Sequence, residues 1–248
     1  MAESEKDYTV LELQARWDKI RVANIYDTLD KMGYPNQCLD LGIRPLFPHT
    51  HLAGKAVTAK GGRDAMTREA IEAIKTASTE NIVSLSSLCF PGCVVIIECG
   101  GEPWTGKFGE MTSWNIKQAG AKGIVLDSMI RDSWGLEVIP DYTVCARGTS
   151  PVESAKRWRI TSVNQPIAMP GTLTTQVRVA PGDWVVAEAD GVIVIPPALV
   201  AEIVAEASKQ EAQDAWVFDR IAEGEPVDGL FPPSATNLAR FEAETGQD

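Results

Sequence analysis

Residues 91–101 of the chain read PGCVVIIECGG, a continuous apolar run enclosed by Pro91-Gly92 before it and Gly100-Gly101 after it. Adjacent β-branched residues with turn residues at both ends are typical of a strand that is covered on both faces of a sheet. The run therefore predicts a core strand over residues 94–97, and with it a protein built around a buried sheet.

The residues that follow repeat this pattern after a helix. We predict a helix over residues 112–121, a second core strand over residues 123–127, which read GIVLD, and a third strand over residues 144–146. Strand, helix and strand in succession are typical of a crossover unit, in which the two strands run parallel. The predicted fold class is therefore α/β.

The rest of the chain supplies more strands and the flanking helices. Further strands are predicted over residues 55–59, 167–169, 176–179, 183–187 and 192–195, the last two joined across the turn Asp190-Gly191. Helices are predicted over residues 66–76 and 199–221, and residues 10–32 form either one helix or two helices with a break near Arg21.

The length of 248 residues predicts one domain with an extension. We expect the domain over residues 1–223. The remaining tail, residues 224–248, is either an arm over a neighbouring subunit or a loosely ordered end.

The composition excludes several classes of partner. The net charge of −11 argues against a nucleic-acid surface, because phosphate binding requires clustered Lys and Arg. No apolar run approaches the length of a membrane span, so we expect no membrane partner. The polar N-terminus lacks the pattern of a secretory signal, and the expected location is the cytoplasm.

The five cysteines and two histidines do not form a zinc-binding pattern. The cysteine count is odd and no two cysteines form a CxxC pair, which favours buried free thiols. His49 and His51 could chelate a metal together, but no third ligand stands near them in the sequence. We interpret them as surface histidines.

Charged residues follow two of the predicted core strands, where ligands gather in open α/β structures. Glu110 stands at the start of a predicted helix, and the backbone N–H groups of Met111, Thr112, Ser113 and Trp114 could bind a carboxylate there. Taken alone, Glu110 could simply complement the helix dipole.

Arg131-Asp132 follows the second core strand, and taken alone it could be an ordinary surface ion pair. However, Glu110 and Asp132 end adjacent elements of one crossover unit, so two carboxylates and one guanidinium can face one cleft. Hard oxygen ligands of this kind suit Mg²⁺ or Mn²⁺ better than zinc.

The spacing of these residues resembles the motif of the RraA-like family, which includes 4-hydroxy-4-methyl-2-oxoglutarate aldolase. Gly109-Glu110 is followed, after twenty intervening residues, by Arg131-Asp132. The resemblance extends over most of the chain up to the final helix, through residues 24–30, 42–46, 52–58, 146–151 and 181–196. It implies a layered, swivelling-domain type of α/β fold with a central β-sheet or barrel.

The resemblance also implies roles for these residues. Asp132 would be the direct metal ligand, Arg131 would hold the substrate and stabilise the developing oxyanion, and Glu110 would position a metal-bound water. The amides from Met111 to Trp114 would bind the substrate carboxylate. Glu211 is the candidate for an acidic residue contributed by a neighbour in a homotrimer or homohexamer, although it could equally be an exposed helix glutamate.

The implied reaction is the metal-dependent cleavage of a small 2-oxo acid. Retro-aldol cleavage leaves an enolate of pyruvate, which Mg²⁺ or Mn²⁺ would stabilise as a Lewis acid. Decarboxylation of oxaloacetate passes through the same enolate and is expected as a side activity. A lysine Schiff base is the other route to such chemistry, but no lysine occurs at the matched positions.

Other functions remain open at this point. The family also contains a non-catalytic regulator that binds a ribonuclease, and a decarboxylase or hydratase could use the same metal and arginine on a related oxo acid. Ser128 replaces an expected glycine, and Ser133-Trp134-Gly135 stands where a further acidic residue is expected. A methyltransferase is excluded, because no glycine-rich strand-to-helix turn occurs.

Overall fold

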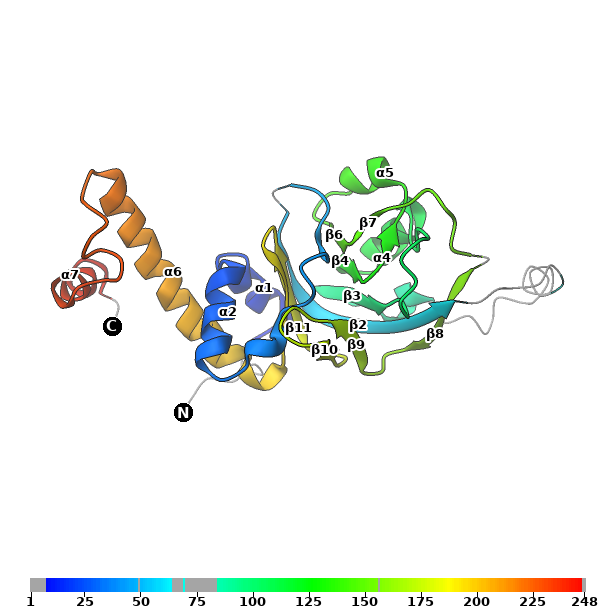
Figure 1. Ribbon diagram of the computed structural model, residues 1–248, viewed down its shortest axis with the longest axis horizontal. Coiled ribbons are helices and arrows are strands. Elements are labelled where there is room, and N and C mark those ends of the chain that lie inside the picture. The colour runs from blue at the N-terminus through cyan, green and yellow to red at the C-terminus, as the bar shows by residue number, and fades with distance from the viewer. Residues whose placement is uncertain (1–7, 49, 64–68, 70–83, 156, 247–248) are drawn as a thin grey trace.

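The centre of the protein is an eight-stranded mixed sheet that curls into a nearly closed barrel (Figure 1). The computed structural model describes residues 8–48, 50–63, 69, 84–155 and 157–246. The sheet has the order β1-β6-β4-β3-β2-β11-β12, and β8 pairs with β2 as well. Its strands are β1 (Arg44–Pro45), β2 (Leu52–Arg63), β3 (Cys93–Glu98), β4 (Ala121–Leu126), β6 (Thr143–Ala146), β8 (Trp158–Val163), β11 (Trp184–Glu188) and β12 (Gly191–Ile195).

The parallel part of the sheet is the part that the apolar runs predict. β2, β3, β4 and β6 are parallel neighbours, and α4 (Glu110–Gln118) connects β3 to β4. Val95 and Ile97 of β3 belong to one core cluster, whereas Val94 and Ile96 belong to another on the opposite face. Both faces of β3 are therefore covered, which confirms the predicted core strand.

The antiparallel part begins on the other side of β2. β11 pairs with β2 and also with β12, and the β11–β12 hairpin turns between Glu188 and Gly191 as predicted. β9 (Ile167–Pro170) and β10 (Gln176–Val179) form a separate hairpin, and the short β5 (Met129–Ile130) pairs with β7 (Gly148–Thr149).

The N-terminal region forms two helices, which confirms the second of the two alternatives. α1 (Val10–Trp17) is closed at its start by a capping box between Thr9 and Glu12. Arg21 is the N-cap of α2 (Val22–Lys31), so the break falls where it is predicted. Together with α6 (Val200–Ala222), these helices cover β11 and β12, and the rings of Trp17 and Trp184 lie 6.1 Å apart at their centroids.

The C-terminal tail contains a helix, which packs against the end of α6. The first half of α6 packs on the sheet, but its second half extends away from the barrel (Figure 1). There Trp216 and Val217 of α6 pack against Leu230 and against Phe241 of α7 (Ala235–Thr245). This small apolar cluster packs α7 against the end of α6, and the expectation of a loosely ordered end stays a prediction. An arm over a neighbouring subunit stays a prediction.

Three further expectations have different outcomes. Within the described ranges no helix is long and apolar enough to cross a membrane. All five cysteines are free thiols, and three of them are buried, in agreement with the sequence. The helix predicted over residues 66–76 lies outside the described residues, apart from Glu69. The short helical segments of the described residues include α5 (Ser133–Glu137) and a 3₁₀ turn at Leu85–Leu88.

Leu126 and Leu173 test whether the β3–β4 core carries the stability of the fold. Leu126 of β4 is fully buried, whereas Leu173 is 63% exposed. We expect Leu126→Ala to lower the free energy of unfolding by about 2–5 kcal/mol, because a cavity is added to the lost apolar burial. The control, Leu173→Ala, should change it by less than about 0.5 kcal/mol. Chemical denaturation measures both, and equal effects would contradict this account of the core.

Candidate functional site

The two chain segments that leave β3 and β4 pair with one another beyond the sheet. The backbone N–H of Lys107 donates to the carbonyl of Met129 at 3.0 Å, and the N–H of Arg131 donates to the carbonyl of Phe108 at 3.1 Å. Residues 106–109 therefore run beside residues 129–132. This pairing brings the start of α4 and the Arg131-Asp132 pair to the same edge of the barrel.

A pocket of about 230 Å³ lies at this edge. It is formed by the pairing segments, by the first turn of α4 and by the loop after β7. The lining residues are Gly106, Lys107, Gly109, Met111, Thr112, Arg131, Asp132, Glu153, Ser154 and Ala155. The structure thus brings Arg131, Asp132, Met111 and Thr112 into one pocket. The lining also includes Glu153, Ser154 and Ala155, which lie in a loop that the sequence patterns do not single out.

Asp132 has an unusual backbone conformation that presents its carboxylate to the pocket. Its φ of 60° and ψ of 43° are left-handed, a conformation that Asp adopts more readily than most residues, and α5 begins immediately after it. The side chain is 43% exposed, and Oδ1 accepts a hydrogen bond from Nε of Arg131 at 3.2 Å. A Cβ atom at Gly109 would overlap Oδ2, so a glycine at position 109 makes room for this carboxylate.

Glu110 points to a different place from the one expected. It is the first residue of α4, and its carboxylate lies against Gly135 of α5, where a Cβ atom would overlap Oε2. It is not among the residues that line the pocket. Glu110 is therefore next to the site, but its side chain contacts α5.

The predicted set of amide donors also needs a correction. The N–H of Ser113 already donates to the carbonyl of Gly109 at 3.0 Å, and Ser113 is fully buried. Trp114 packs against the hydrophobic core. Only the N–H groups up to the third residue of a helix lack a partner within the helix, because the N–H of the fourth residue donates to the carbonyl of the N-cap. Met111 and Thr112 are therefore the predicted donors that lie in the pocket.

Glu211 lies on α6, well away from this pocket within one chain. It accepts hydrogen bonds from Nε of Arg21 at 2.9 Å and from Nδ2 of Asn24 at 2.8 Å, and Asp214 binds the same two side chains. These contacts fasten α6 to the start of α2. A contribution of Glu211 to a neighbouring subunit's site stays a prediction.

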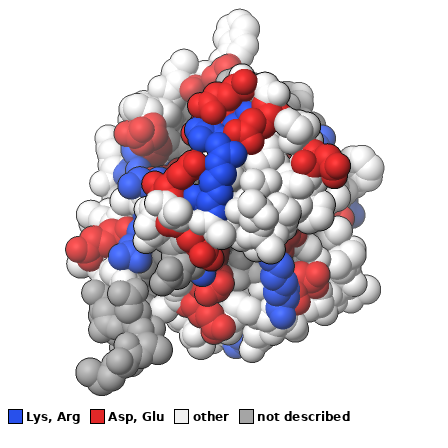
Figure 2. All heavy atoms as spheres, turned by 90° about the vertical axis from the view of Figure 1, so that its left-hand side faces the viewer, with Lys and Arg blue, Asp and Glu red and all other residues white. Residues whose placement is uncertain are grey.

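The end of the molecule formed by α6 and α7 carries charges of both signs side by side (Figure 2). Arg240 binds Glu225 at 2.9 Å and Glu244 at 2.9 Å, and Arg220 binds Glu223 at 3.1 Å. On the face that Figure 2 shows, these pairs place basic and acidic side chains next to one another.

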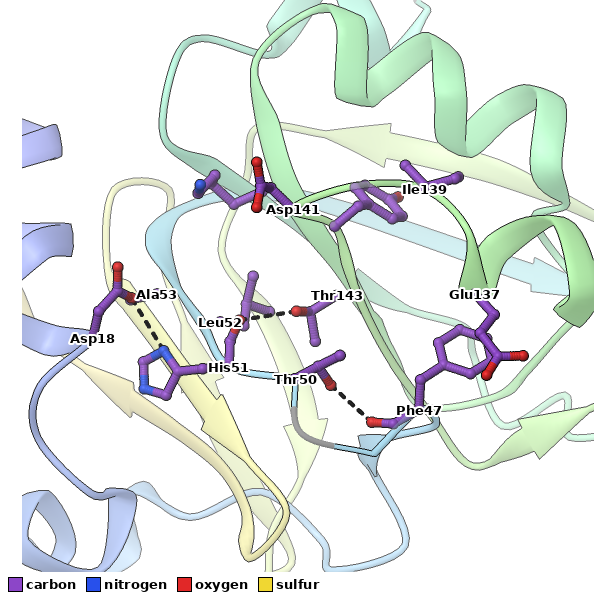
Figure 3. A pocket seen from close by; sticks show the side chains of 12 residues that line it. Asp18, Phe47, Thr50, His51, Leu52, Ala53, Glu137, Ile139, Asp141 and Thr143 are labelled. Carbon is purple, nitrogen blue, oxygen red and sulfur yellow. Dashed lines mark hydrogen bonds and ion pairs between the residues drawn. The ribbon is translucent and has the colours of Figure 1, made fainter.

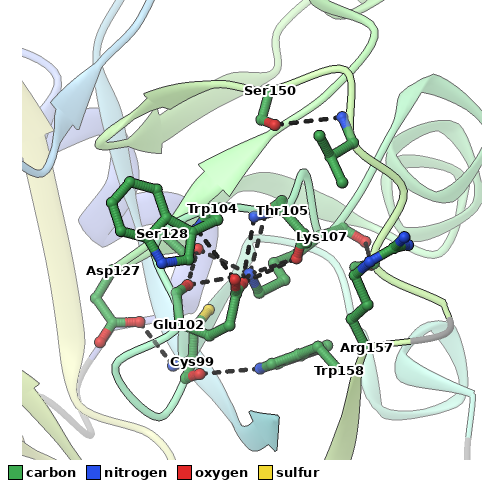
Figure 4. A network of polar contacts seen from close by, with 12 residues as sticks. Cys99, Glu102, Trp104, Thr105, Lys107, Asp127, Ser128, Ser150, Arg157 and Trp158 are labelled. Carbon is green, nitrogen blue, oxygen red and sulfur yellow. Dashed lines mark hydrogen bonds and ion pairs between the residues drawn. The ribbon is translucent and has the colours of Figure 1, made fainter. Parts of the chain in front are cut away.

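A buried ion pair, drawn in Figure 4, adjoins the pocket through Lys107, which is one of the lining residues. The ammonium of Lys107 binds the carboxylate of Glu102, and the side chains are 0% and 2% exposed. Burial alone would raise the pKa of Glu102, but hydrogen bonds from Lys107, from Thr105 and from the amides of Trp104 and Thr105 lower it to about 2. Lys107 is thus a lysine near the site whose ammonium is fully engaged, which makes it unsuited to form a Schiff base.

A second pocket, of about 350 Å³, lies at the opposite end of the parallel strands (Figure 3). Its walls include Lys122 near the start of β4 and Thr143 at the start of β6. Nδ1 of His51 lies 3.1 Å from Oδ1 of Asp18 there, whereas His49 is outside the described residues. Ligands in α/β proteins gather at the carboxyl ends of strands, so we favour the smaller pocket as the functional one.

The oxygen atoms that line the smaller pocket could hold a metal through few protein ligands. Across the described ranges, no group of three or more His, Cys, Asp or Glu residues could enclose an ion. Asp132 supplies one partly exposed carboxylate in a space large enough for water and a small ligand. Mg²⁺ is commonly bound in this way, through one or two carboxylates with several waters.

A family model described as RraA-like (Aldolase/RraA) matches residues 22–194, which include every residue of the pocket. The chain belongs to the RraA-like family. It is 29% identical over 192 residues to a Halalkalibacterium halodurans protein provisionally named 4-hydroxy-4-methyl-2-oxoglutarate aldolase, a match that covers 77% of this chain and 79% of that protein.

Solved structures share the fold. A Pseudomonas syringae protein of uncharacterised function superposes with a TM-score of 0.72 at 22% identity, over 90% of this chain and 99% of that one. Streptomyces coelicolor RraAS2, described as an unusual member of the RNase ES inhibitor RraA family, superposes with a TM-score of 0.67 at 25% identity, over 86% of this chain and 96% of that one.

The depressed pKa of Glu102 predicts a loss of stability in acid. Because the pKa in the folded protein lies below the ordinary value of 4.5, the ionised form is favoured by folding. Its contribution, up to about 3 kcal/mol, is complete above pH 4.5 and is lost as the pH falls towards 2. Glu102→Gln should lack this contribution, so the stability difference from wild type should shrink over that range. Denaturation midpoints between pH 2 and 6 measure the difference, and a constant value would contradict the prediction.

Proposed function

We propose that this RraA-like protein is a divalent-metal-dependent carbon–carbon lyase. It would cleave a 4-hydroxy-2-oxo acid such as 4-hydroxy-4-methyl-2-oxoglutarate and release pyruvate. The observation that carries the proposal is the pocket itself, in which Arg131, Asp132 and the first turn of α4 meet at the carboxyl ends of parallel strands. The provisional aldolase name of the Halalkalibacterium halodurans relative supports the same reaction class.

Mg²⁺ or Mn²⁺ would be held by the carboxylate of Asp132. The residue offers a hard oxygen donor in a partly open pocket, and Arg131 and Gly109 fix its orientation. When bound, the ion would supply Lewis-acid stabilisation of negative charge on the 2-oxo group.

The residues of the chain would bind the substrate and stabilise its charge. Arg131 presents a guanidinium that can form paired hydrogen bonds to the oxo acid and favour the enolate as it develops. The N–H groups of Met111 and Thr112 stand at the positive end of the α4 dipole and would bind the carboxylate. Glu153, a second carboxylate in the lining, could accept the proton of the 4-hydroxyl group.

Two further expectations belong to this proposal. Decarboxylation of oxaloacetate should occur as a side activity, because it passes through the same pyruvate enolate. We also expect a homotrimer or homohexamer, in which Glu211 of a neighbour would act at the site and Glu110 would hold a water next to it.

The rival function is a non-catalytic regulator that binds a ribonuclease. The family membership of Streptomyces coelicolor RraAS2 and the acidic net charge of −11 favour this alternative. A different enolate-forming reaction, such as hydration or decarboxylation of a related oxo acid, would use the same pocket. Metal-dependent release of pyruvate from 4-hydroxy-4-methyl-2-oxoglutarate distinguishes the lyase from both, because a decarboxylase or a hydratase would not break the carbon–carbon bond beside the 4-hydroxyl group.

Matched asparagine variants test the site. Chelator-treated enzyme should release pyruvate from 4-hydroxy-4-methyl-2-oxoglutarate only after Mg²⁺ or Mn²⁺ is restored. Asp132→Asn should reduce kcat/KM by at least about 100-fold, because it removes the carboxylate but retains a residue that tolerates a left-handed backbone. Asp141→Asn is the control, since Asp141 also has a positive φ, of 48°, but lines the other pocket. Full activity of Asp132→Asn would exclude the assigned site.

Two glycine variants test the room that Asp132 needs. Gly109→Ala should weaken Mn²⁺ binding about 10–100-fold, because its methyl group would displace the carboxylate of Asp132. Gly62→Ala is the matched control, since a Cβ atom there meets nothing within 4 Å. Isothermal titration with Mn²⁺ gives both affinities. The same affinity in the two variants would show that position 109 does not constrain the ligand.

A further inference from the structure

The loop from Glu102 to Lys107 closes around a single ammonium group (Figure 4). Nζ of Lys107 contacts the Glu102 carboxylate, the Glu102 carbonyl at 3.1 Å, the Thr105 carbonyl at 3.0 Å and Oγ1 of Thr105 at 2.9 Å. Nζ also donates to Oγ of Ser128 at 2.9 Å. These acceptors surround the ammonium, and the charge is removed from water on all sides.

Stability alone does not account for such a pair. A buried ion pair is often no more stabilising than apolar side chains of similar volume, since the desolvation of both charges offsets their attraction. The best-attested use of buried polar groups is to fix one register between neighbouring elements. The place of Lys107 in the chain fits that use.

Lys107 belongs to both the ion pair and the pairing that builds the pocket. Its side chain is enclosed by the Glu102 loop, whereas its backbone N–H donates to Met129 at 3.0 Å and its carbonyl accepts from Oγ of Ser154 at 3.2 Å. The enclosed ammonium therefore tethers the segment that lies beside Arg131.

Ser128 connects the ammonium to the second strand of the pairing. Its hydroxyl accepts from Lys107 and donates to the carbonyl of Glu102 at 2.5 Å. Ser128 directly precedes β5, which leads into Arg131 and Asp132. One ammonium is thus bonded to both segments that carry the pocket residues. The serine that replaces an expected glycine has a structural role in this network.

The pairing tolerates little displacement. A Cβ atom at Gly106 would lie 2.7 Å from Cβ of Arg131, and one at Gly109 would overlap Oδ2 of Asp132. A slip of one residue would place the side chain of Lys107 or Phe108 where a glycine is required. Register in this short pairing therefore decides where Arg131 and Asp132 stand relative to α4.

From this geometry we infer that Lys107 and Glu102 are positioning residues, whose buried ion pair fixes the register of residues 106–109 against residues 129–132. Both charged side chains are enclosed, although Lys107 belongs to the pocket lining, and the pair acts through the backbone beside Arg131 and Asp132. Its effect on turnover rests on the proposed function, but the register itself can be measured without substrate.

The test compares full-length variants that differ in one ion pair. Glu102→Gln with Lys107→Met removes both charges together, so that neither remains buried and unpaired if the single Lys107→Met variant fails to fold. Lys60→Met is the control, because it removes the ion pair with Glu98, at 2.6 Å, on the β2–β3 strands. Amide hydrogen exchange is followed in peptides that cover residues 105–110 and 128–133, and kcat and KM are measured with Mn²⁺.

In the double variant, exchange in these two peptides should rise at least about tenfold, while peptides from β3 and β4 keep their wild-type rates. If the wild type is a lyase, kcat should fall about 100-fold, as expected for groups displaced by about 1 Å, with KM changed by less than about threefold. Lys60→Met should change neither quantity.

Two results would overturn the inference. One is wild-type exchange in both peptides of the double variant. The other is a uniform rise that includes β3 and β4, which would mean general destabilisation. Absence of lyase turnover in the wild type would refute the proposed function instead, and the exchange rates would still decide whether the ion pair fixes the register.

Discussion

The burial of β3 on both faces is the constraint on which the rest of the structure depends. A strand with apolar neighbours above, below and on each side cannot present polar groups along its length, so chemistry can begin only where the strand ends. Parallel pairing with β4 then requires a crossover, which α4 supplies. The start of this helix and the residues after β4 consequently share one edge of the barrel.

Local positive groups at that edge would offset the repulsion between an acidic protein and an anionic ligand. A net charge of −11 would repel the anionic oxo acid of the proposed reaction at long range, so its capture would have to rely on local groups. Arg131, the first amides of α4 and an ion on Asp132 would act over a few ångströms. Met111 and Trp134 are large apolar side chains that lie largely exposed near the site.

The sequence predicts the elements well because they depend on local patterns. Apolar runs mark the core strands, and the turn at Asp190-Gly191 marks the hairpin. The rule that ligands gather at strand ends is enough to place Arg131, Asp132 and the start of α4 together. The direction of Glu110 could not be predicted, since its carboxylate rests on Gly135 of another helix. The burial of Lys107 likewise depends on a loop that folds back around it, and its sequence neighbourhood carries no sign of that contact.

The left-handed backbone at Asp132 limits which residues can occupy that position without strain. Among residues with a side chain, asparagine and aspartate tolerate this conformation best, and glycine accepts it freely. A longer acid such as glutamate could keep the charge only by straining the turn into α5. The substitutions that best preserve the fold at this position, to asparagine or glycine, are therefore the ones that remove the carboxylate. If Asp132 holds the metal as proposed, such a position would allow the proposed catalysis to be lost in one step while the surface of the protein stays intact for other uses.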